Sequence, residues 1–416
     1  MTLASPQQRL TDFLRSLPFS VDELPSEACL VGGAVRDALL QRESQYIDFD
    51  FVVPEKAVET AREISHKYRA GFVVLDAERH IARVVFPNGT LDFAQQEGAS
   101  LEIDLQRRDY CANAIAYHIR RNHLIDPLQG VSDLDNRLLR MVAAENLADD
   151  PLRLLRAYRQ AAQLGFSIDG ATRTKLREFA PLIKNVAAER VQVELNYLLE
   201  NPHGDRWLAL AQADGVLDYW LPDADVESLE KIQKIQGLSL DLSRDYPEFR
   251  MNPDWVTGAK LLCLLSGNLE QAQQVILSLK YSRGVVRAVS LAVEMLPDLL
   301  AIAAQPMTLR EQYFFFLGVK TSFPIMAIAA LASGLDRAKL EPLLQRYFDP
   351  KDQVAHPQPL VTGNDLIQQL GMQPSPQIGT LLTEIQIAHI EGKIQAKNEA
   401  ITWGRSLLQT LPNNPQ

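Results

Sequence analysis

The sequence predicts an α+β protein in which a small α/β head is followed by a long all-α region. Up to about residue 140, short apolar runs alternate as strands do and are interspersed with a few helical stretches. After that point apolar residues recur at helical spacing almost to the end. The 416 residues suffice for two to four compact units. We expect a head at 1–140, a neck at 141–203, a body at 204–350 and a tail at 351–416.

The elements of the head follow from local patterns. Residues 47–53 alternate around Asp48 and Asp50 as a strand would, and the turn at 87–89 contains a Pro-Asn-Gly sequence. Leu30-Val31 leads into Gly32-Gly33 and a short helix at 34–40. The other expected elements are helices at 57–68 and 110–116 and a strand meander at 72–75, 81–86 and 90–93.

The second part begins with a helix start at Asp149-Asp150-Pro151, an acidic cap followed by proline at the first helical position. Residues 348–362, rich in proline and aspartate, are the best candidate for a linker. The expected helices are 151–164, 171–180, 187–200, 204–214, 226–236, 255–265, 268–280, 284–303, 308–318, 322–334, 336–347, 362–370, 376–392 and 394–409.

Composition restricts the class of protein. Hydrophobic residues make up 46% and charged residues 23% of the chain, which is typical of soluble proteins. There is no run of about 18 apolar residues and no basic leader, so we expect neither a membrane span nor a secretory signal. Cys29, Cys111 and Cys263 are far apart and lack metal-ligand spacing, which indicates reduced thiols and a cytoplasmic protein.

The net charge of −10 argues against a protein that coats nucleic acid with its whole surface. It leaves room for a local basic groove, because arginines cluster at 107–108, at 120–121 and along 153–159.

The carboxylates of Asp48-Phe49-Asp50 are the centre of the functional prediction. Residues i and i+2 of a strand face the same side, so both carboxylates meet near one point, which is costly without a cation. Mg²⁺ is usually held by one or two carboxylates and substrate phosphates. Two such ions would activate a 3′-hydroxyl and stabilise the leaving pyrophosphate. Taken alone, the pair is more typical of two strand aspartates at a sheet edge than of a metal site.

The Gly32-Gly33 turn strengthens this interpretation. Glycines that open a helix let backbone N–H groups approach phosphate oxygens, and Arg36 would add a bidentate phosphate contact. Together, residues 32–37 and the Asp48-x-Asp50 pair resemble the signature of the class II CCA-adding enzymes and bacterial poly(A) polymerases. This resemblance implies a polymerase-β-like nucleotidyltransferase head, a tRNA substrate, and Mg²⁺ held by Asp48 and Asp50.

Further motifs of the family occur in order. Asp92 lies on a strand that the family places beside the D-x-D strand, which makes it either a third catalytic carboxylate or a solvent-facing aspartate. Residues 107–114 resemble the R-R-D-x-x-x-N-A motif, which implies ribose and triphosphate binding by Arg108, Asp109 and Asn113. The alternative is a capping aspartate with a buried asparagine.

Residues 149–159 resemble the family's E-D-x-x-R motif, with Asp149 in place of the glutamate. Asp150 and Arg153 would jointly read a Watson–Crick edge, the carboxylate accepting from an exocyclic amino group and the guanidinium donating to ring acceptors. Cytosine and adenine offer such an edge and uracil does not. Arg156 and Arg159 would extend this stripe toward phosphates. The competing interpretation is a helix cap with an i,i+3 salt bridge.

The resemblance extends to both later regions. Residues 188–195 resemble the E-R-x-x-x-E-L helix of the neck, in which Glu189, Arg190 and Glu194 would be structural. Residues 360–379 resemble the tail that grips the tRNA elbow, where capping and packing roles are equally plausible.

The interval between Asp50 and Arg107 bears on which nucleotide is added. Full CCA-adding relatives carry a polar, mobile loop there, and residues 92–105 lead almost directly into Arg107 instead. In the family, loss of this loop marks enzymes that add two cytidines from CTP and leave the adenosine to a separate enzyme. We therefore expect CC addition to the tRNA 3′ end.

The alternatives are a full CCA-adding enzyme that also uses ATP, a poly(A) polymerase and an inactive RNA-binding homologue. Poly(A) polymerases of the family usually have a basic C-terminal extension, whereas residues 411–416 are neutral. An inactive homologue should have lost Asp48 or Asp50, and both are present. A bifunctional phosphohydrolase relative would need a His-Asp dipeptide, which the sequence lacks.

Overall fold

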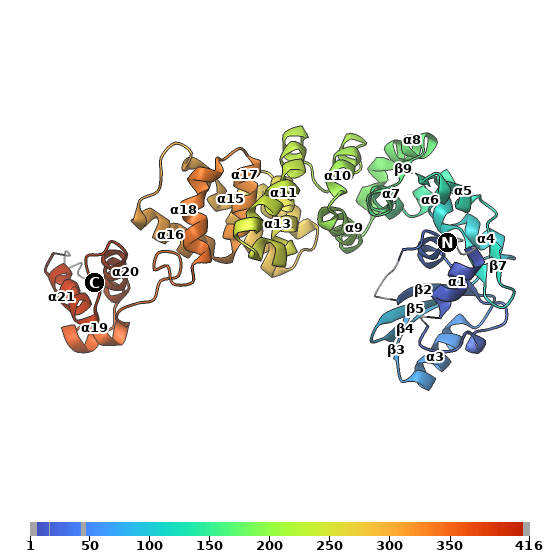
Figure 1. The fold of residues 1–416 in the computed structure, drawn as a ribbon, viewed down its shortest axis with the longest axis horizontal. Coiled ribbons are helices and arrows are strands. Elements are labelled where there is room, and N and C mark those ends of the chain that lie inside the picture. Colours follow the sequence, from blue (N-terminus) through green and yellow to red (C-terminus); the bar gives the residue numbers. More distant parts are fainter. Residues whose placement is uncertain (1–5, 16, 43–46, 411–416) are drawn as a thin grey trace. The chain divides into compact units, whose positions relative to one another are not determined.

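The computed structural model describes residues 6–15, 17–42 and 47–410, and its contacts divide the chain into two compact units, 1–220 and 221–416. The first unit contains a mixed sheet with helices. Every regular element described in the second unit is helical. The α+β fold class with a helical C-terminal region is confirmed (Figure 1).

The sheet of the first unit has seven strands in the order β3-β4-β5-β2-β1-β6-β7. β2 and β5 pair in parallel and the other neighbours pair antiparallel. The strand meander predicted at 72–93 is confirmed as β3, β4 and β5. The strands are β1 (Cys29–Val31), β2 (Ile47–Val53), β3 (Gly71–Asp76), β4 (Ile81–Phe86), β5 (Gly89–Gln95), β6 (Ala116–His118) and β7 (His123–Ile125).

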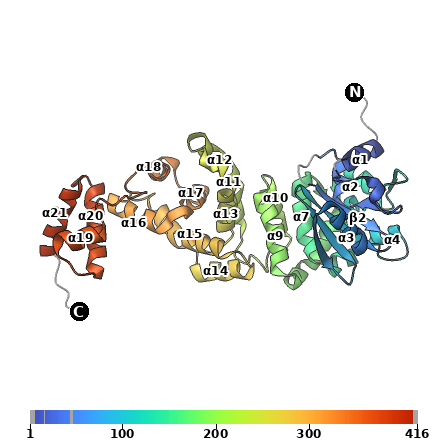
Figure 2. The ribbon, with the colours of Figure 1, turned by 90° about the horizontal axis from the view of Figure 1, so that it is seen from below.

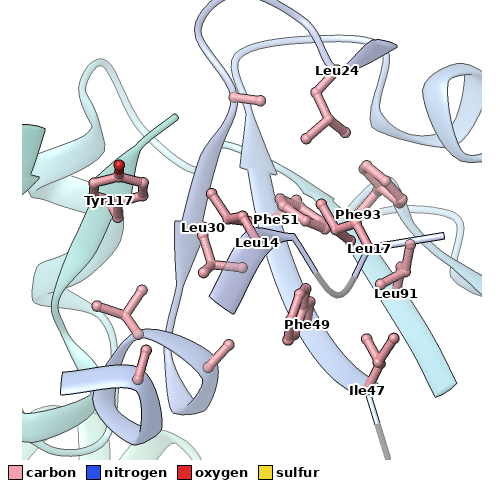
Figure 3. Packing of buried hydrophobic residues seen from close by; sticks show 14 of the residues in the cluster. Leu14, Leu17, Leu24, Leu30, Ile47, Phe49, Phe51, Leu91, Phe93 and Tyr117 are labelled. Atoms are coloured by element: carbon pink, nitrogen blue, oxygen red, sulfur yellow. The ribbon is translucent and has the colours of Figure 1, made fainter. Parts of the chain in front are cut away.

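One face of the sheet is apolar and closed. Along β2, Ile47, Phe49 and Phe51 are buried and point to the same side, where Phe51 stacks on Phe93 of β5 with ring centroids 5.2 Å apart (Figure 3). Alternation puts the intervening residues of β2 on the other face. Three helices contribute to the core beneath the apolar face: α1 (Pro6–Leu14), α2 (Gly33–Leu39) and α3 (Ala57–Tyr68).

The opposite face is only partly covered. Leu105 of α4 (Leu101–Gln106) joins a small cluster with Val31 and Val52, which closes the face over β1 and the end of β2. The helix predicted at 110–116 is wrong. Residues 111–113 form one 3-10 turn, and Ala116–His118 becomes β6, because its backbone pairs with the otherwise open side of β1.

The predicted helix start at Asp149-Asp150-Pro151 also needs correction. Asp149 ends one helix, α6 (Ala144–Asp149), and Pro151 precedes the next, α7 (Leu152–Leu164). The Asp150 side chain does not cap α7, because it is bound by Arg190. The first unit continues with α5 (Gly130–Asp135), the paired strands β8 (Leu138–Leu139) and β9 (Ser167–Ile168), and α8 (Gly170–Phe179), α9 (Ala188–Glu200) and α10 (Gly204–Ala213).

The regular elements described in the second unit are helices (Figure 2). Most of them were predicted to within a few residues. The one expected at 226–236 extends to Asp245, where the inner side of the helix still buries Leu242. The helices are α11 (Val226–Asp245), α12 (Glu248–Met251), α13 (Pro253–Cys263), α14 (Leu269–Ser278), α15 (Arg283–Ala301), α16 (Leu309–Val319), α17 (Phe323–Ala332), α18 (Arg337–Phe348), α19 (Gly363–Leu370), α20 (Pro376–Ile390) and α21 (Lys397–Thr410).

The segment Leu309–Ala332 is the one described stretch long and apolar enough to cross a membrane by length and composition. A 3-10 turn at Lys320–Ser322 divides it into α16 and α17, and about two thirds of its apolar 18-residue window is buried inside the protein. These helices therefore serve as core of the helical unit.

Candidate active site

Three aspartates gather on the open face of the sheet. Asp48 and Asp50 alternate with the buried Phe49 on β2, so both lie opposite the apolar core. Asp50 is in register with Asp92 on β5, and Asp48 is in register with Thr90. The structure thus brings together the three carboxylates that the sequence singled out.

Each outer carboxylate has a partner within the sheet. The Thr90 hydroxyl donates to Oδ1 of Asp48 at 2.9 Å. Arg83 on β4 donates Nε and Nη2 to the two oxygens of Asp92, at 2.7 and 2.8 Å. Asp92 is therefore not a free solvent-facing aspartate, and it can contact a cation or a substrate only if it shares an oxygen with Arg83.

The glycine turn lies against these carboxylates. Gly32 has φ +72° and ψ −138°, a conformation that favours glycine. A Cβ atom there would lie 3.2 Å from Oδ2 of Asp50 and 3.1 Å from Nη1 of Arg108. The chain at Gly32-Gly33, which opens α2, therefore passes close to the carboxylate of Asp50 and the guanidinium of Arg108.

A polar cavity of about 600 Å³ opens beside the carboxylates. Val52 and Ala94 in its wall lie two residues beyond Asp50 and Asp92 on the same face of the sheet. Its volume suits a small-molecule ligand. The lining residues are Val52, Arg79, Ile81, Ala94, Gln95, Glu97, Asp104, Arg107, Arg108, Asn146, Asp149, Asp150, Arg153 and Arg190.

The two predicted base readers both line this cavity and are both held by protein groups. Arg190 donates to the two oxygens of Asp150 at 3.1 and 2.9 Å. Nη1 of Arg153 donates to the backbone carbonyls of Arg107, at 2.9 Å, and Asn146, at 3.0 Å. Their orientations are therefore set before any nucleotide arrives.

The remaining predicted nucleotide-binding residues form a second, buried network. Asn113 accepts from Nη1 of Arg36 at 2.7 Å and donates to Asp109 at 2.9 Å. Arg156 donates Nε and Nη2 to Asp109 at 3.1 and 3.0 Å. Arg159 binds Glu194. None of these five predicted residues is among those that line the 600 Å³ cavity.

The pKa values of Asp50, on the open face of the sheet, and of Asp109, in the buried network, are shifted in opposite directions. The pKa of Asp50 is raised to about 6, chiefly by burial and also by the nearby Asp92 and Asp48, against the opposing effect of Arg108. For Asp109, burial alone would raise the pKa, but Arg156 and the hydrogen bonds from Asn113 and the Tyr110 N–H hold it well below its ordinary value. The charged form of Asp50 is thus disfavoured in the folded protein, whereas the charged form of Asp109 is stabilised by its partners.

The donor set limits how a metal could bind. In the parts of the chain that the structure describes, no three His, Cys, Asp or Glu side chains meet as a complete metal site. Asp48 and Asp50 on one strand face fit the alternative, a hard cation held by two carboxylates and completed by substrate phosphates. A bound cation would also offset the repulsion from Asp92 and Asp48, which adds to the effect of burial on the pKa of Asp50.

Sequence reasoning missed three residues of the site. Arg83 was not singled out, because its role depends on the register of β4 against β5. Arg190 was expected to be structural, and it reaches the cavity by pairing with Asp150. Asn146 belongs to none of the motifs identified in the sequence. Only the structure shows that it is a buried polar residue.

Three family models match successive parts of the chain. "Poly A polymerase head domain" matches residues 28–97 and 93–140. "Probable RNA and SrmB-binding site of polymerase A" matches residues 165–227, and "tRNA nucleotidyltransferase domain 2 putative" matches residues 254–403.

Relatives and solved structures agree with these matches. The chain is 51% identical to a CC-adding tRNA nucleotidyltransferase of Synechocystis, over 97% of this chain and 99% of that protein. It is 31% identical to a CC-adding tRNA nucleotidyltransferase of Geobacter sulfurreducens, over 90% of each. A Thermotoga maritima CCA-adding enzyme complexed with tRNA has the same fold, with a TM-score of 0.72 and 21% identity over 96% of this chain and 98% of that one.

Proposed function

The chain belongs to the class II tRNA nucleotidyltransferases, and from this premise we propose that it adds two cytidines, and no adenosine, to the 3′ end of tRNA. The reaction joins the tRNA 3′-hydroxyl to the α-phosphorus of CTP and releases pyrophosphate. The relative with 51% identity carries the name of a CC-adding enzyme, and its near full-length match is the observation that carries the proposal.

The connection between β5 and α4 supports this choice of nucleotide. β5 ends at Gln95 and α4 begins at Leu101, and α4 is followed at once by Arg107 in the cavity wall. The connection at 96–100 is therefore short, and the mobile loop that we expect of full CCA-adding enzymes is missing from this interval. Without it the base-reading site stays shaped for cytosine, and the adenosine is left to a separate enzyme.

We assign the chemistry to the aspartates on the open sheet face. Members of the polymerase-β-like nucleotidyltransferase family typically use divalent metals. Asp48 and Asp50 would hold Mg²⁺, which when bound activates the 3′-hydroxyl and neutralises charge on the departing pyrophosphate. Arg83 compensates the charge of Asp92, so the cluster does not carry three uncompensated carboxylates.

Binding and selection fall to neighbouring groups. The N–H groups of the Gly32-Gly33 turn and the Arg108 guanidinium bind the triphosphate beside Asp50. In the cavity, Asp150 accepts from the cytosine amino group while Arg153 donates to the ring acceptors. Arg36, Asp109, Asn113, Arg156 and Arg159 act through the buried network that fixes α7 against the head.

We assign catalysis to the head at 1–140, base recognition to the neck at 141–203, and binding of the tRNA acceptor stem and elbow to the helical body and tail. We also propose that the protein works in the cytoplasm, because Cys29, Cys111 and Cys263 are free thiols.

The test offers purified protein a tRNA that ends at the discriminator base, with CTP alone, ATP alone, or both. The proposal predicts two added cytidines in both reactions that contain CTP, and no product with ATP alone. Addition of a terminal adenosine would establish the full CCA activity instead. An ATP-only tail would indicate poly(A) synthesis, and no product in any reaction would indicate an inactive homologue.

A further inference from the structure

Asn146 on α6 connects two parts of the cavity wall. Its side chain is buried, with 8% of the residue exposed. The carboxamide nitrogen donates to the backbone carbonyls of Gln106, at 2.7 Å, and Arg108, at 2.9 Å. Both N–H groups of one amide therefore hold the carbonyls on either side of Arg107.

The backbone of the same residue holds the base reader. Nη1 of Arg153 donates to the carbonyl of Asn146 at 3.0 Å and to the carbonyl of Arg107 at 2.9 Å. The guanidinium thus rests on two carbonyls, and the side chain of Asn146 fixes the segment that supplies one of them. Asn146, residues 106–108 and Arg153 form a closed set of hydrogen bonds.

We propose that Asn146 is a positioning residue that holds Arg153 in the orientation suited to cytosine and so determines the preference for CTP over ATP. The inference rests on the proposed base-reading role of Arg153. It deepens that role by naming what keeps the guanidinium from turning toward a larger base.

The chemistry of the contact supports asparagine at this position. Two carbonyl acceptors on one side require two donors from one small group, which a primary amide supplies and a carboxylate does not. Without the amide, the carbonyls of Gln106 and Arg108 lose this partner and residues 106–108 are free to shift. Arg153 would then keep its charge, but the Arg107 carbonyl that holds its guanidinium would no longer be fixed. The preference for CTP should therefore fall more than the rate of nucleotide transfer.

The experiment uses the full-length protein, a tRNA that ends at the discriminator base, and steady-state addition of cytidine from CTP with ATP present as a competitor. The preference for CTP over ATP is the inhibition constant of ATP divided by the KM for CTP. For Asn146→Ala and for the isosteric Asn146→Asp, we expect the KM for CTP to rise roughly tenfold, the size of one lost hydrogen bond in a buried site. The preference for CTP over ATP should fall by a similar factor, and kcat should change by less than about twofold. Asn146→Ser, which keeps one donor and is the smaller disturbance if the others do not fold, should lie between.

Thr172→Val is the matched control. Thr172 is fully buried in the same unit, and its hydroxyl accepts from the Met141 N–H at 2.9 Å and donates to Asp169 at 3.1 Å. It does not line the cavity. This variant should lose thermal stability comparably and keep the wild-type KM for CTP and the wild-type nucleotide preference.

Two results would overturn the inference. A wild-type KM for CTP and a wild-type nucleotide preference in the folded Asn146 variants would show that the hydrogen bonds of Asn146 do not affect nucleotide selection. Equal loss of preference in Thr172→Val at the same drop in melting temperature would show a general effect of destabilisation. Failure of the wild-type protein to add cytidine would refute the proposed function itself, and is read separately in the same assay.

Discussion

Replacing Asp50 with asparagine should stabilise the metal-free protein at pH 8 while it abolishes cytidine transfer. The pKa of Asp50 is raised from its ordinary value of 3.8 to about 6, chiefly by burial. The folded state therefore binds this proton more tightly than the unfolded state. Ionisation of Asp50 therefore lowers the free energy of unfolding. This loss is absent below pH 4, grows as the pH rises from the unfolded-state pKa to the folded-state pKa, and is complete above pH 6.

The difference between these two pKa values corresponds to ~3 kcal/mol. We expect about half of that on substitution, because the carboxylate is partly exposed and the new amide also needs hydrogen-bond partners. For a unit of this size, such a gain raises the melting temperature by about 3–6 °C. The gain should appear at pH 8 in the presence of EDTA and vanish at pH 4.

The control for this prediction is Asp92→Asn. Asp92 is paired with Arg83 through two hydrogen bonds, so its loss should lower the melting temperature at pH 8. Thermal unfolding of the three proteins in EDTA at both pH values measures the contrast. The reasoning fails if Asp50→Asn melts at or below the wild-type temperature at pH 8, or if its gain is the same at pH 4.

Three further substitutions probe the site. Gly32→Ala forces a Cβ into a positive-φ position, and we expect a loss of about 1–2 kcal/mol in thermal unfolding with a large rise in the KM for CTP; wild-type kinetics would contradict the cradle. Arg156→Ala leaves the buried Asp109 without its cation and should cost about 3–5 kcal/mol in urea unfolding; a smaller cost at pH 7 than at pH 3 would contradict the depressed pKa of Asp109. Arg190→Ala should change stability by less than about 1 kcal/mol, because the pair is exposed, yet raise the KM for CTP severalfold by releasing Asp150; an unchanged KM would exclude a role for this pair.

The parts of the site that the sequence predicted are those with a local period. Asp48 and Asp50 alternate with Phe49, so one strand assignment was enough to place both carboxylates on one face. Most helices of the second unit were predictable because their apolar residues recur at helical spacing. α17 is an exception, because it is buried on nearly all sides.

The parts that were missed depend on pairing between distant segments. Arg83 reaches Asp92 only because β4 and β5 pair in one register, and a slip of one residue would turn it to the core. Residues 110–116 contain several small apolar side chains that fit a helix or a buried strand. The free side of β1 draws Ala116 into β6, and only a 3-10 turn is left at 111–113. Asp150 was predicted to cap α7 because acidic residues before proline often do, but Arg190 from α9 offered a charged partner.

The most direct test of the account is the number of cytidines that Asp48→Ala and Asp50→Ala add to a tRNA that ends at the discriminator base. Product mass gives this number, and circular dichroism and tRNA binding establish that each variant is folded. Two residues from the wild-type protein and none from either variant are the expected result. Cytidine addition at the wild-type rate by either folded variant would mean that the chemistry lies elsewhere in the molecule.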